Sequence, residues 1–106
     1  MKQRLTVLGS TGSIGTSTLD VVRRHPDQFE IFALSAATQV DALLAQCQAF
    51  TPRYAVMASA AHAAQLAEKL KQNNLKTEVL QAPDALETIA SHAEVDTVMG
   101  AIVGAA

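Results

Sequence analysis

The chain has 106 residues, of which 49% are hydrophobic and 4% aromatic, and it carries a formal net charge of −2. This length and composition predict one small globular domain with an aliphatic core, and the balanced charge without basic runs argues against a nucleic-acid partner. No segment has the roughly 20 consecutive apolar residues of a membrane span, and a single cysteine permits no internal disulfide, so we expect a cytoplasmic protein with no membrane partner.

The first predicted element is the short apolar strand Leu5–Leu8, which runs into the glycine-rich segment 9–15 and then into a predicted helix, Thr16–Arg24. A strand, a glycine turn and a helix in this order form phosphate-binding sites. The first turn of such a helix has unpaired N–H groups that point at the bound anion. We therefore expect a phosphate site made of backbone donors near the start of the chain.

The three glycines of this turn have separate expected roles. Gly9 fits the tight turn, Gly12 the close approach of a pyrophosphate, and Gly15 the close packing of the helix on the strand. Thr11 and Ser13 add short hydroxyl donors. The pattern is Gly-x-x-Gly-x-x-Gly rather than the commoner Gly-x-Gly-x-x-Gly, so an ordinary strand-to-helix turn without a ligand remains the alternative.

Strands and helices continue to alternate beyond the first helix, which His25 and Pro26 end. The apolar residues of the next helix fall on one face and include Cys47, which is therefore expected in the core. The predicted helices run from Val40 to near Thr51, from an N-cap at Ser59 to about Gln72, and from Pro83 to Ala90. The predicted strands are Phe29–Leu34, Tyr54–Met57, Glu78–Leu80 and Thr97–Ala101.

This βαβαβαβαβ order predicts an α/β fold of the doubly wound, Rossmann-like class, with a parallel sheet and helices on both faces. In such sheets ligands bind beyond the carboxyl ends of the strands, at the point where the strand order reverses. That point normally lies next to the first strand. The glycine turn is therefore expected at the binding edge.

The end of the second predicted strand bears on the choice of cofactor. NAD-binding domains usually carry an acid there, about 20 residues past the glycine turn, to hold the ribose 2′-hydroxyl. The count reaches Ser35, and the segment 35–39 has no acid, while Asp41 falls in the following helix, where a first-turn acid is usual. A missing carboxylate favours NADP(H), although the segment also has no Lys or Arg to pair with the 2′-phosphate.

Four blocks of sequence carry a resemblance to a known family. They are residues 9–15, 17–21, 52–56 and 101–106. In this order and spacing, over the whole chain, they closely resemble the N-terminal domain of the bacterial 1-deoxy-D-xylulose 5-phosphate reductoisomerases.

The resemblance implies an NADPH-dependent enzyme that rearranges and reduces 1-deoxy-D-xylulose 5-phosphate to 2-C-methyl-D-erythritol 4-phosphate in the non-mevalonate isoprenoid pathway. It also implies a phosphosugar substrate, a Mg or Mn ion that polarises the substrate oxygens, and a homodimer. The implied cofactor contacts are Thr11, Gly12, Ser13 and Ile14 at the pyrophosphate and nicotinamide side, Ala37, Thr38 and Gln39 at the adenosine 2′-phosphate, and Ile102 and Val103 near the dinucleotide. At 37–39 the family usually has glycine, often a lysine, and asparagine, so this chain departs from the pattern there.

The apolar end of the chain, 101–106, follows a predicted strand whose next helix is missing, so a fragment is expected. Residues 1–106 are then interpreted as a truncated N-terminal NADPH-binding domain, with the catalytic and C-terminal domains absent. The family's metal-binding carboxylates and substrate-phosphate ligands correspond to positions beyond Ala106. We therefore expect no catalytic residue and no metal ligand in this chain. Its histidines are expected at a helix end or on the surface: His25, His62 and His92.

Two other functions stay open at this point. One is a different NADP-dependent dehydrogenase, such as a semialdehyde dehydrogenase, which would bring a nucleophilic cysteine. The other is a non-catalytic nucleotide-sensing domain, which a short chain without an acid, base or metal cluster resembles superficially.

Overall fold

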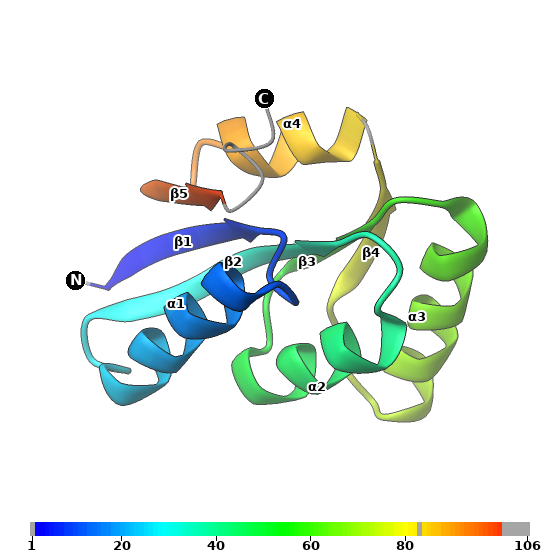
Figure 1. Ribbon diagram of the computed structural model, residues 1–106, viewed down its shortest axis with the longest axis horizontal. Coiled ribbons are helices and arrows are strands. Elements are labelled where there is room, and N and C mark those ends of the chain that lie inside the picture. Colours follow the sequence, from blue (N-terminus) through cyan, green and yellow to red (C-terminus); the bar gives the residue numbers. More distant parts are fainter. Residues whose placement is uncertain (1, 83, 101–106) are drawn as a thin grey trace.

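Strands and helices alternate throughout the computed structural model, which describes residues 2–82 and 84–100 (Figure 1). The strands are β1 (Gln3–Leu8), β2 (Phe29–Ala36), β3 (Tyr54–Met57), β4 (Glu78–Gln81) and β5 (Thr97–Gly100). The helices are α1 (Ser13–Arg24), α2 (Val40–Phe50), α3 (Ala60–Gln72) and α4 (Asp84–Ser91). The predicted order of elements is confirmed.

The element boundaries differ from the predicted ones at a few ends. Helix α1 begins at Ser13, three residues before the predicted start at Thr16, because Gly15 continues the first helical turn rather than preceding it. Strand β2 extends to Ala36, two residues past the predicted end at Leu34. The predicted first residue of the last helix, Pro83, and the predicted last residue of the fifth strand, Ala101, lie outside the described residues.

The five strands form one parallel sheet in the order β4-β3-β2-β1-β5. The chain runs outward from β1 through β2 and β3 to β4, and then returns to the other side of β1 as β5. The strand order therefore reverses between β1 and β5, which is where doubly wound sheets bind their ligands. Helices α1, α2 and α3 cover one face of the sheet and α4 covers the other (Figure 1). The predicted α/β doubly wound fold with helices on both faces is confirmed.

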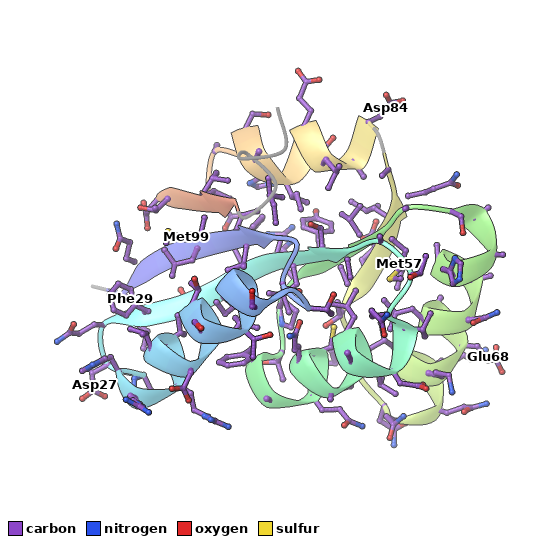
Figure 2. The ribbon with its side chains drawn as sticks, viewed as in Figure 1. Asp27, Phe29, Met57, Glu68, Asp84 and Met99 are labelled. Carbon is purple, nitrogen blue, oxygen red and sulfur yellow. The ribbon has the colours of Figure 1, made fainter. Side chains whose placement is uncertain are left out.

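The larger core cluster packs α1, α2 and α3 against the sheet, and a smaller one packs α4 against the opposite face. The fully buried members of the larger cluster include Leu34, Leu43, Cys47 and Leu66. Cys47 is therefore a core residue, as predicted, and its burial raises the pKa of the thiol to about 12. The acidic side chains of Asp27, Glu68 and Asp84 project outward at the rim of the molecule (Figure 2).

The three histidines differ in how far they are exposed. His25 is exposed at the C-terminal end of α1, as expected. His92 is partly buried, with its ring centroid 4.7 Å from that of Phe32, and His62 is partly buried with Nδ1 2.6 Å from Ser59 Oγ. His62 and His92 therefore lie at the surface as predicted, but each is only partly exposed, because its ring contacts Ser59 or Phe32.

Among the described residues, no helix has the length and apolar character that crossing a lipid bilayer demands.

Candidate functional site

The glycine turn leaves β1 at the carboxyl edge of the sheet. Gly9 adopts a φ of 67°, in the left-handed region that favours glycine, and the N–H of Gly12 donates to its carbonyl oxygen at 3.0 Å. The tight-turn role predicted for Gly9 is therefore confirmed. The turn directs the chain from β1 into α1.

The inner side of the turn is fixed by hydrogen bonds to β2 and α2. The N–H of Gly9 donates to Ser35 Oγ at 3.0 Å, and the N–H of Ser10 donates to the carbonyl oxygen of Ser35 at 2.8 Å. The fully buried Ser10 hydroxyl donates to Gln46 Oε1 at 2.6 Å, and Gln46 Nε2 donates to the carbonyl oxygen of Ser10 at 2.8 Å. Strand β2 and helix α2, both distant from the turn in sequence, therefore hold it in place through hydrogen bonds.

The residue count that placed the ribose-facing position at Ser35 is wrong. Its side chain is buried and accepts a hydrogen bond from the turn itself. Residues 31–36 of β2 are all buried, so the first exposed side chain comes two residues after Ser35, at Ala37, just beyond the end of the strand.

Gly12 and Gly15 differ in what surrounds them. A β-carbon added at Gly15 would lie 2.5 Å from the carbonyl oxygen of Gly9 and 2.6 Å from Ser10 Cα, so the fold itself requires glycine there. The close packing predicted for Gly15 is confirmed, although its contact is with the turn. Among the described residues, a β-carbon at Gly12 would meet only the Gly9 carbonyl oxygen, at 3.4 Å, and Gly12 is exposed in an extended conformation that any residue adopts. The fold therefore does not require glycine at position 12.

At the N-terminus of α1, Gly12 and Ser13 are exposed and Gly15 is buried. Gly12 occupies the N-cap position without a side-chain hydrogen bond, and the first turn contains no acidic residue. The N–H groups of Ser13, Ile14 and Gly15 belong to the first turn of the helix, where no intrahelical acceptor exists for them. Backbone donors of this kind, together with the helix dipole, are what binds anions at helix N-termini. The Thr16 hydroxyl donates to the Gly12 carbonyl oxygen at 2.8 Å, which keeps that acceptor turned into the helix.

The predicted hydroxyl donors lie on the outer side of this turn, with Thr11 partly exposed and Ser13 exposed. Both are thus placed for a ligand at the N-terminus of α1. Ile14 contributes its backbone N–H at the same place.

The second predicted group of contacts, Ala37, Thr38 and Gln39, links β2 to α2 at the same edge of the sheet, and its side chains are exposed. Backbone hydrogen bonds fix its path: Ala58 N–H donates to the Ala37 carbonyl oxygen at 3.3 Å, and Val40 N–H to that of Thr38 at 2.9 Å. Ser35 contacts the turn and lies two residues before Ala37, so segment 37–39 begins close to the turn. The structure thus brings residues 11–14 and 37–39 to one edge, whereas Ile102 and Val103 lie outside the described residues.

The nearest acid in sequence, Asp41, lies in the first turn of α2, as predicted. Its carboxylate is 3.5 Å from Lys69 Nζ on α3. Both side chains are well exposed, so this pair is worth little in stability. The carboxylate of Asp41, close in sequence to segment 37–39, is nevertheless paired with the Lys69 ammonium group.

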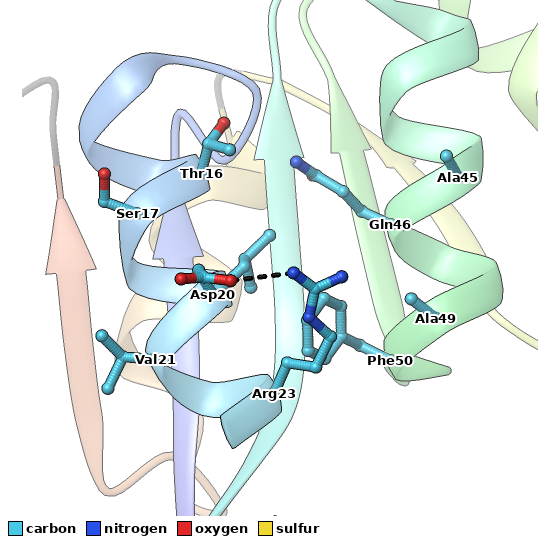
Figure 3. Close-up of a pocket in the computed structure, with 10 residues that line it drawn as sticks. Thr16, Ser17, Asp20, Val21, Arg23, Ala45, Gln46, Ala49 and Phe50 are labelled. Carbon is cyan, nitrogen blue, oxygen red and sulfur yellow. Dashed lines mark hydrogen bonds and ion pairs between the residues drawn. The ribbon is translucent and has the colours of Figure 1, made fainter. Parts of the chain in front are cut away.

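A groove of about 620 Å³ runs between α1 and α2, behind the turn (Figure 3). Its walls include Leu19, Ala49 and Phe50, and Asp20 beside it is bound to Arg23 at 2.8 Å. The hydrogen bond from Arg23 and the charge of Arg24 lower the pKa of the Asp20 carboxyl. None of the predicted cofactor contacts lines this groove, but Thr16 and Gln46, which bond to Gly12 and Ser10 of the turn, do.

Over residues 2–82 and 84–100, no group of three or more His, Cys, Asp or Glu side chains is arranged to hold a metal ion. The sequence analysis missed Ser10 and Gln46 as parts of the site. Periodicity assigns Gln46 to α2, but it does not indicate that the side chain reaches a turn 36 residues earlier in the chain.

Comparison with known proteins gives consistent results. The family model described as 1-deoxy-D-xylulose 5-phosphate reductoisomerase matches residues 5–106. Proteins of that name from Tolumonas auensis and Aromatoleum aromaticum are 58% and 56% identical to this chain over 104 residues, or 98% of it. The matched region is 26% of each relative, so the chain spans about a quarter of their length.

Solved structures of this kind share the fold. A DOX-P reductoisomerase in complex with NADPH, fosmidomycin and magnesium superposes with a TM-score of 0.86 at 42% identity, over 91% of this chain and 23% of that one. The 1-deoxy-D-xylulose 5-phosphate reductoisomerase from Zymomonas mobilis, in complex with NADPH, gives a TM-score of 0.81 at 33% identity, over 89% and 24%.

Proposed function

Because the chain belongs to the 1-deoxy-D-xylulose 5-phosphate reductoisomerase family, we propose that residues 1–106 form the NADPH-binding part of such an enzyme. The proposed reaction is the NADPH-dependent rearrangement and reduction of 1-deoxy-D-xylulose 5-phosphate to 2-C-methyl-D-erythritol 4-phosphate. The catalytic residues and the Mg or Mn ligands then lie in other parts of the enzyme, which acts as a homodimer in the cytoplasm.

The N-terminus of α1 carries this proposal. Gly12 is exposed, and among the described residues a β-carbon there would meet the Gly9 carbonyl oxygen alone and no side chain caps the helix. A pyrophosphate fits such a cradle because it brings the acceptors that the first helical turn needs. Bound NADPH supplies the hydride for the reduction. The chain's own part is to bind and orient the dinucleotide through Thr11, Gly12, Ser13 and Ile14.

The proposed place of the adenosine 2′-phosphate is segment 37–39, whose exposed side chains follow β2 at the same edge. The hydroxyl of Thr38 and the amide of Gln39 are its candidate donors. An Ala37→Asp variant tests this placement by adding a carboxylate without touching Ser35. We expect it to reduce the preference for NADPH over NADH by about 1–3 kcal/mol, and an unchanged preference would place the 2′-phosphate elsewhere.

The activity itself is tested in a chimera in which this chain replaces the matching region of the Tolumonas auensis reductoisomerase. We expect NADPH oxidation that depends on 1-deoxy-D-xylulose 5-phosphate, whereas the isolated chain should bind nucleotide weakly and show no turnover. A folded Gly12→Val chimera should lose affinity for NADPH, because its side chain occupies the space of the phosphates. Unchanged affinity in that variant would contradict the assigned site, and an inactive chimera of normal fold would contradict the function.

The comparisons do not support the other dehydrogenase interpretation, because the family model that matches residues 5–106 is that of the reductoisomerases. The nucleophilic cysteine of a semialdehyde dehydrogenase would lie beyond Ala106, so the buried Cys47 does not decide between the two. Turnover by the chimera would also argue against the alternative of a non-catalytic nucleotide-sensing domain.

A further inference from the structure

The amide of Gln46 makes two hydrogen bonds to one residue of the turn. Its Nε2 donates to the carbonyl oxygen of Ser10 at 2.8 Å, and its Oε1 accepts from the Ser10 hydroxyl at 2.6 Å. That hydroxyl has a single hydrogen, and the carbonyl oxygen of Ser35 lies farther from it, at 3.2 Å. The shorter contact takes the hydrogen, so Gln46 uses both ends of its amide on Ser10.

Helix α2 gives Gln46 a fixed base. Leu43 and Cys47, which flank it on the same helix, are fully buried against the sheet. The side chain of Gln46 reaches from α2 toward α1 (Figure 3). Because a packed helix moves little, the amide fixes Ser10 relative to the sheet.

Ser10 in turn lies directly against the first turn of α1. A β-carbon at Gly15 would be 2.6 Å from Ser10 Cα and 2.8 Å from the Ser10 carbonyl carbon, so the two backbones are in close contact. The N–H of Gly15 is one of the donors of the helix N-terminus. A shift of Ser10 therefore moves, or releases, the donors that face the ligand.

We propose that Gln46 is a positioning residue for the phosphate-binding turn. By holding Ser10, its amide keeps the N–H groups of Ser13, Ile14 and Gly15 aimed at the pyrophosphate before the nucleotide arrives. Donors held in place before binding lose little conformational entropy when the ligand binds. This inference rests on the proposed function, because it assigns a role to Gln46 in binding the dinucleotide.

The test is a titration of the full chain with NADP⁺, followed by the amide chemical shifts, which report weak as well as tight binding. Gln46→Met keeps the length of the side chain and removes its amide. We expect its dissociation constant to rise about tenfold, because both hydrogen bonds from Gln46 to Ser10 are lost and the Ser10 hydroxyl keeps only the longer contact to the Ser35 carbonyl oxygen. The matched control is Gln48→Met on the same helix, whose amide donates to Asn73 Oδ1, at the end of α3, at 3.2 Å. Its dissociation constant should equal that of the parent chain.

A second variant separates positioning from a general loss of stability. Gln46→Glu keeps an acceptor for the Ser10 hydroxyl but, as a carboxylate, cannot donate to the Ser10 carbonyl oxygen. Protonation of the carboxyl restores the donor, so its affinity relative to the parent chain should recover as the pH falls from about 8 to about 5. The parent chain at each pH corrects for protonation of the 2′-phosphate, and Gln48→Glu should show no such recovery.

The outcomes are distinct. If the parent chain binds NADP⁺ while Gln46→Met binds equally well, or Gln46→Glu shows no recovery at low pH, the positioning role is wrong and the proposed function stands. If neither the parent chain nor the parent chimera binds NADP⁺, the proposed function fails, and the role of Gln46 fails with it.

Discussion

Helices α1 and α3 both begin at the carboxyl edge of the sheet, yet their N-termini are completed differently. In α3, Ser59 Oγ accepts from the N–H of His62 at 3.3 Å, so a side chain of the protein satisfies the first turn. In α1, Gly12 occupies the corresponding position and contributes no side-chain hydrogen bond. Neither first turn contains an acid. The described chain thus caps the first turn of α3 but not that of α1, where the proposed function places the ligand.

The other two helices support this contrast. Asp41 lies in the first turn of α2, and Asp84 and Glu87 lie in that of α4. Carboxylates there offset the helix dipole. Of the four helices in the described part of the chain, α1 alone has neither a side-chain cap nor a first-turn acid, and it is also the one that follows the glycine turn.

The largest expected effect comes from crowding the inner side of the turn. Gly15→Ala places a β-carbon 2.5 Å from the Gly9 carbonyl oxygen, so the backbone must shift, and we expect a loss of about 2–3 kcal/mol in the free energy of unfolding. Gly12→Ala, with its nearest atom at 3.4 Å, should cost less than about 1 kcal/mol. Urea unfolding of the two variants checks this order, and equal losses would mean that the two glycines are not distinct.

Removing the cap of α3 should affect stability alone. Ser59→Ala leaves the N–H of His62 without its acceptor, and we expect a loss of about 1 kcal/mol in the free energy of unfolding. The affinity for NADP⁺ should be unchanged, because that helix end does not belong to the site. A weaker affinity in this variant would show that the nucleotide contacts α3 as well.

The smallest expected change in stability is that of Ser13→Asp, for which stability and nucleotide affinity should change in opposite directions. Ser13→Asp gives α1 the first-turn acid that it lacks, and should raise the free energy of unfolding by about 0.3–1 kcal/mol. The same carboxylate repels the phosphates, so nucleotide affinity should fall. Ala60→Asp, at the first position of α3, is the matched control: it should stabilise similarly and leave affinity unchanged. A Ser13→Asp variant that binds NADP⁺ as tightly as its parent argues against a phosphate at this helix end.

Much of the fold, and the outer half of the site, could be predicted from local sequence. Gly9 and Gly15 stand where a tight turn and a close contact exclude a β-carbon, and these demands depend on residues within a few positions of each other. The inner half could not be predicted in this way. Ser35 and Gln46 reach Ser10 across 25 and 36 residues of sequence, so their partners depend on how β2 and α2 pack.

The position of Ser35 shows a second limit. Counting along the chain reaches the end of β2, but it does not show that residues 31–36 are all buried and that the first exposed position comes two residues after Ser35, at Ala37. Ser35, which the count placed at the ribose, instead accepts a hydrogen bond from the N–H of Gly9 in the turn. The partial burial of His92 could not be predicted either, because it depends on a contact with the ring of Phe32, which is far away in sequence.

The most direct test of the account is to locate bound nucleotide on the two helix ends. In a titration of the isotopically labelled chain with NADP⁺, we expect the largest amide shifts at Ser13, Ile14 and Gly15, and none at the first turn of α3, residues 60–62. Hydrogen bonding to phosphate and the nearby charge both move the α1 amides, whereas α3 has its own cap. Shifts that are largest at α3 or along the groove between α1 and α2, with Ser13 to Gly15 unchanged, would contradict the claim that the N-terminal end of α1 is the phosphate site.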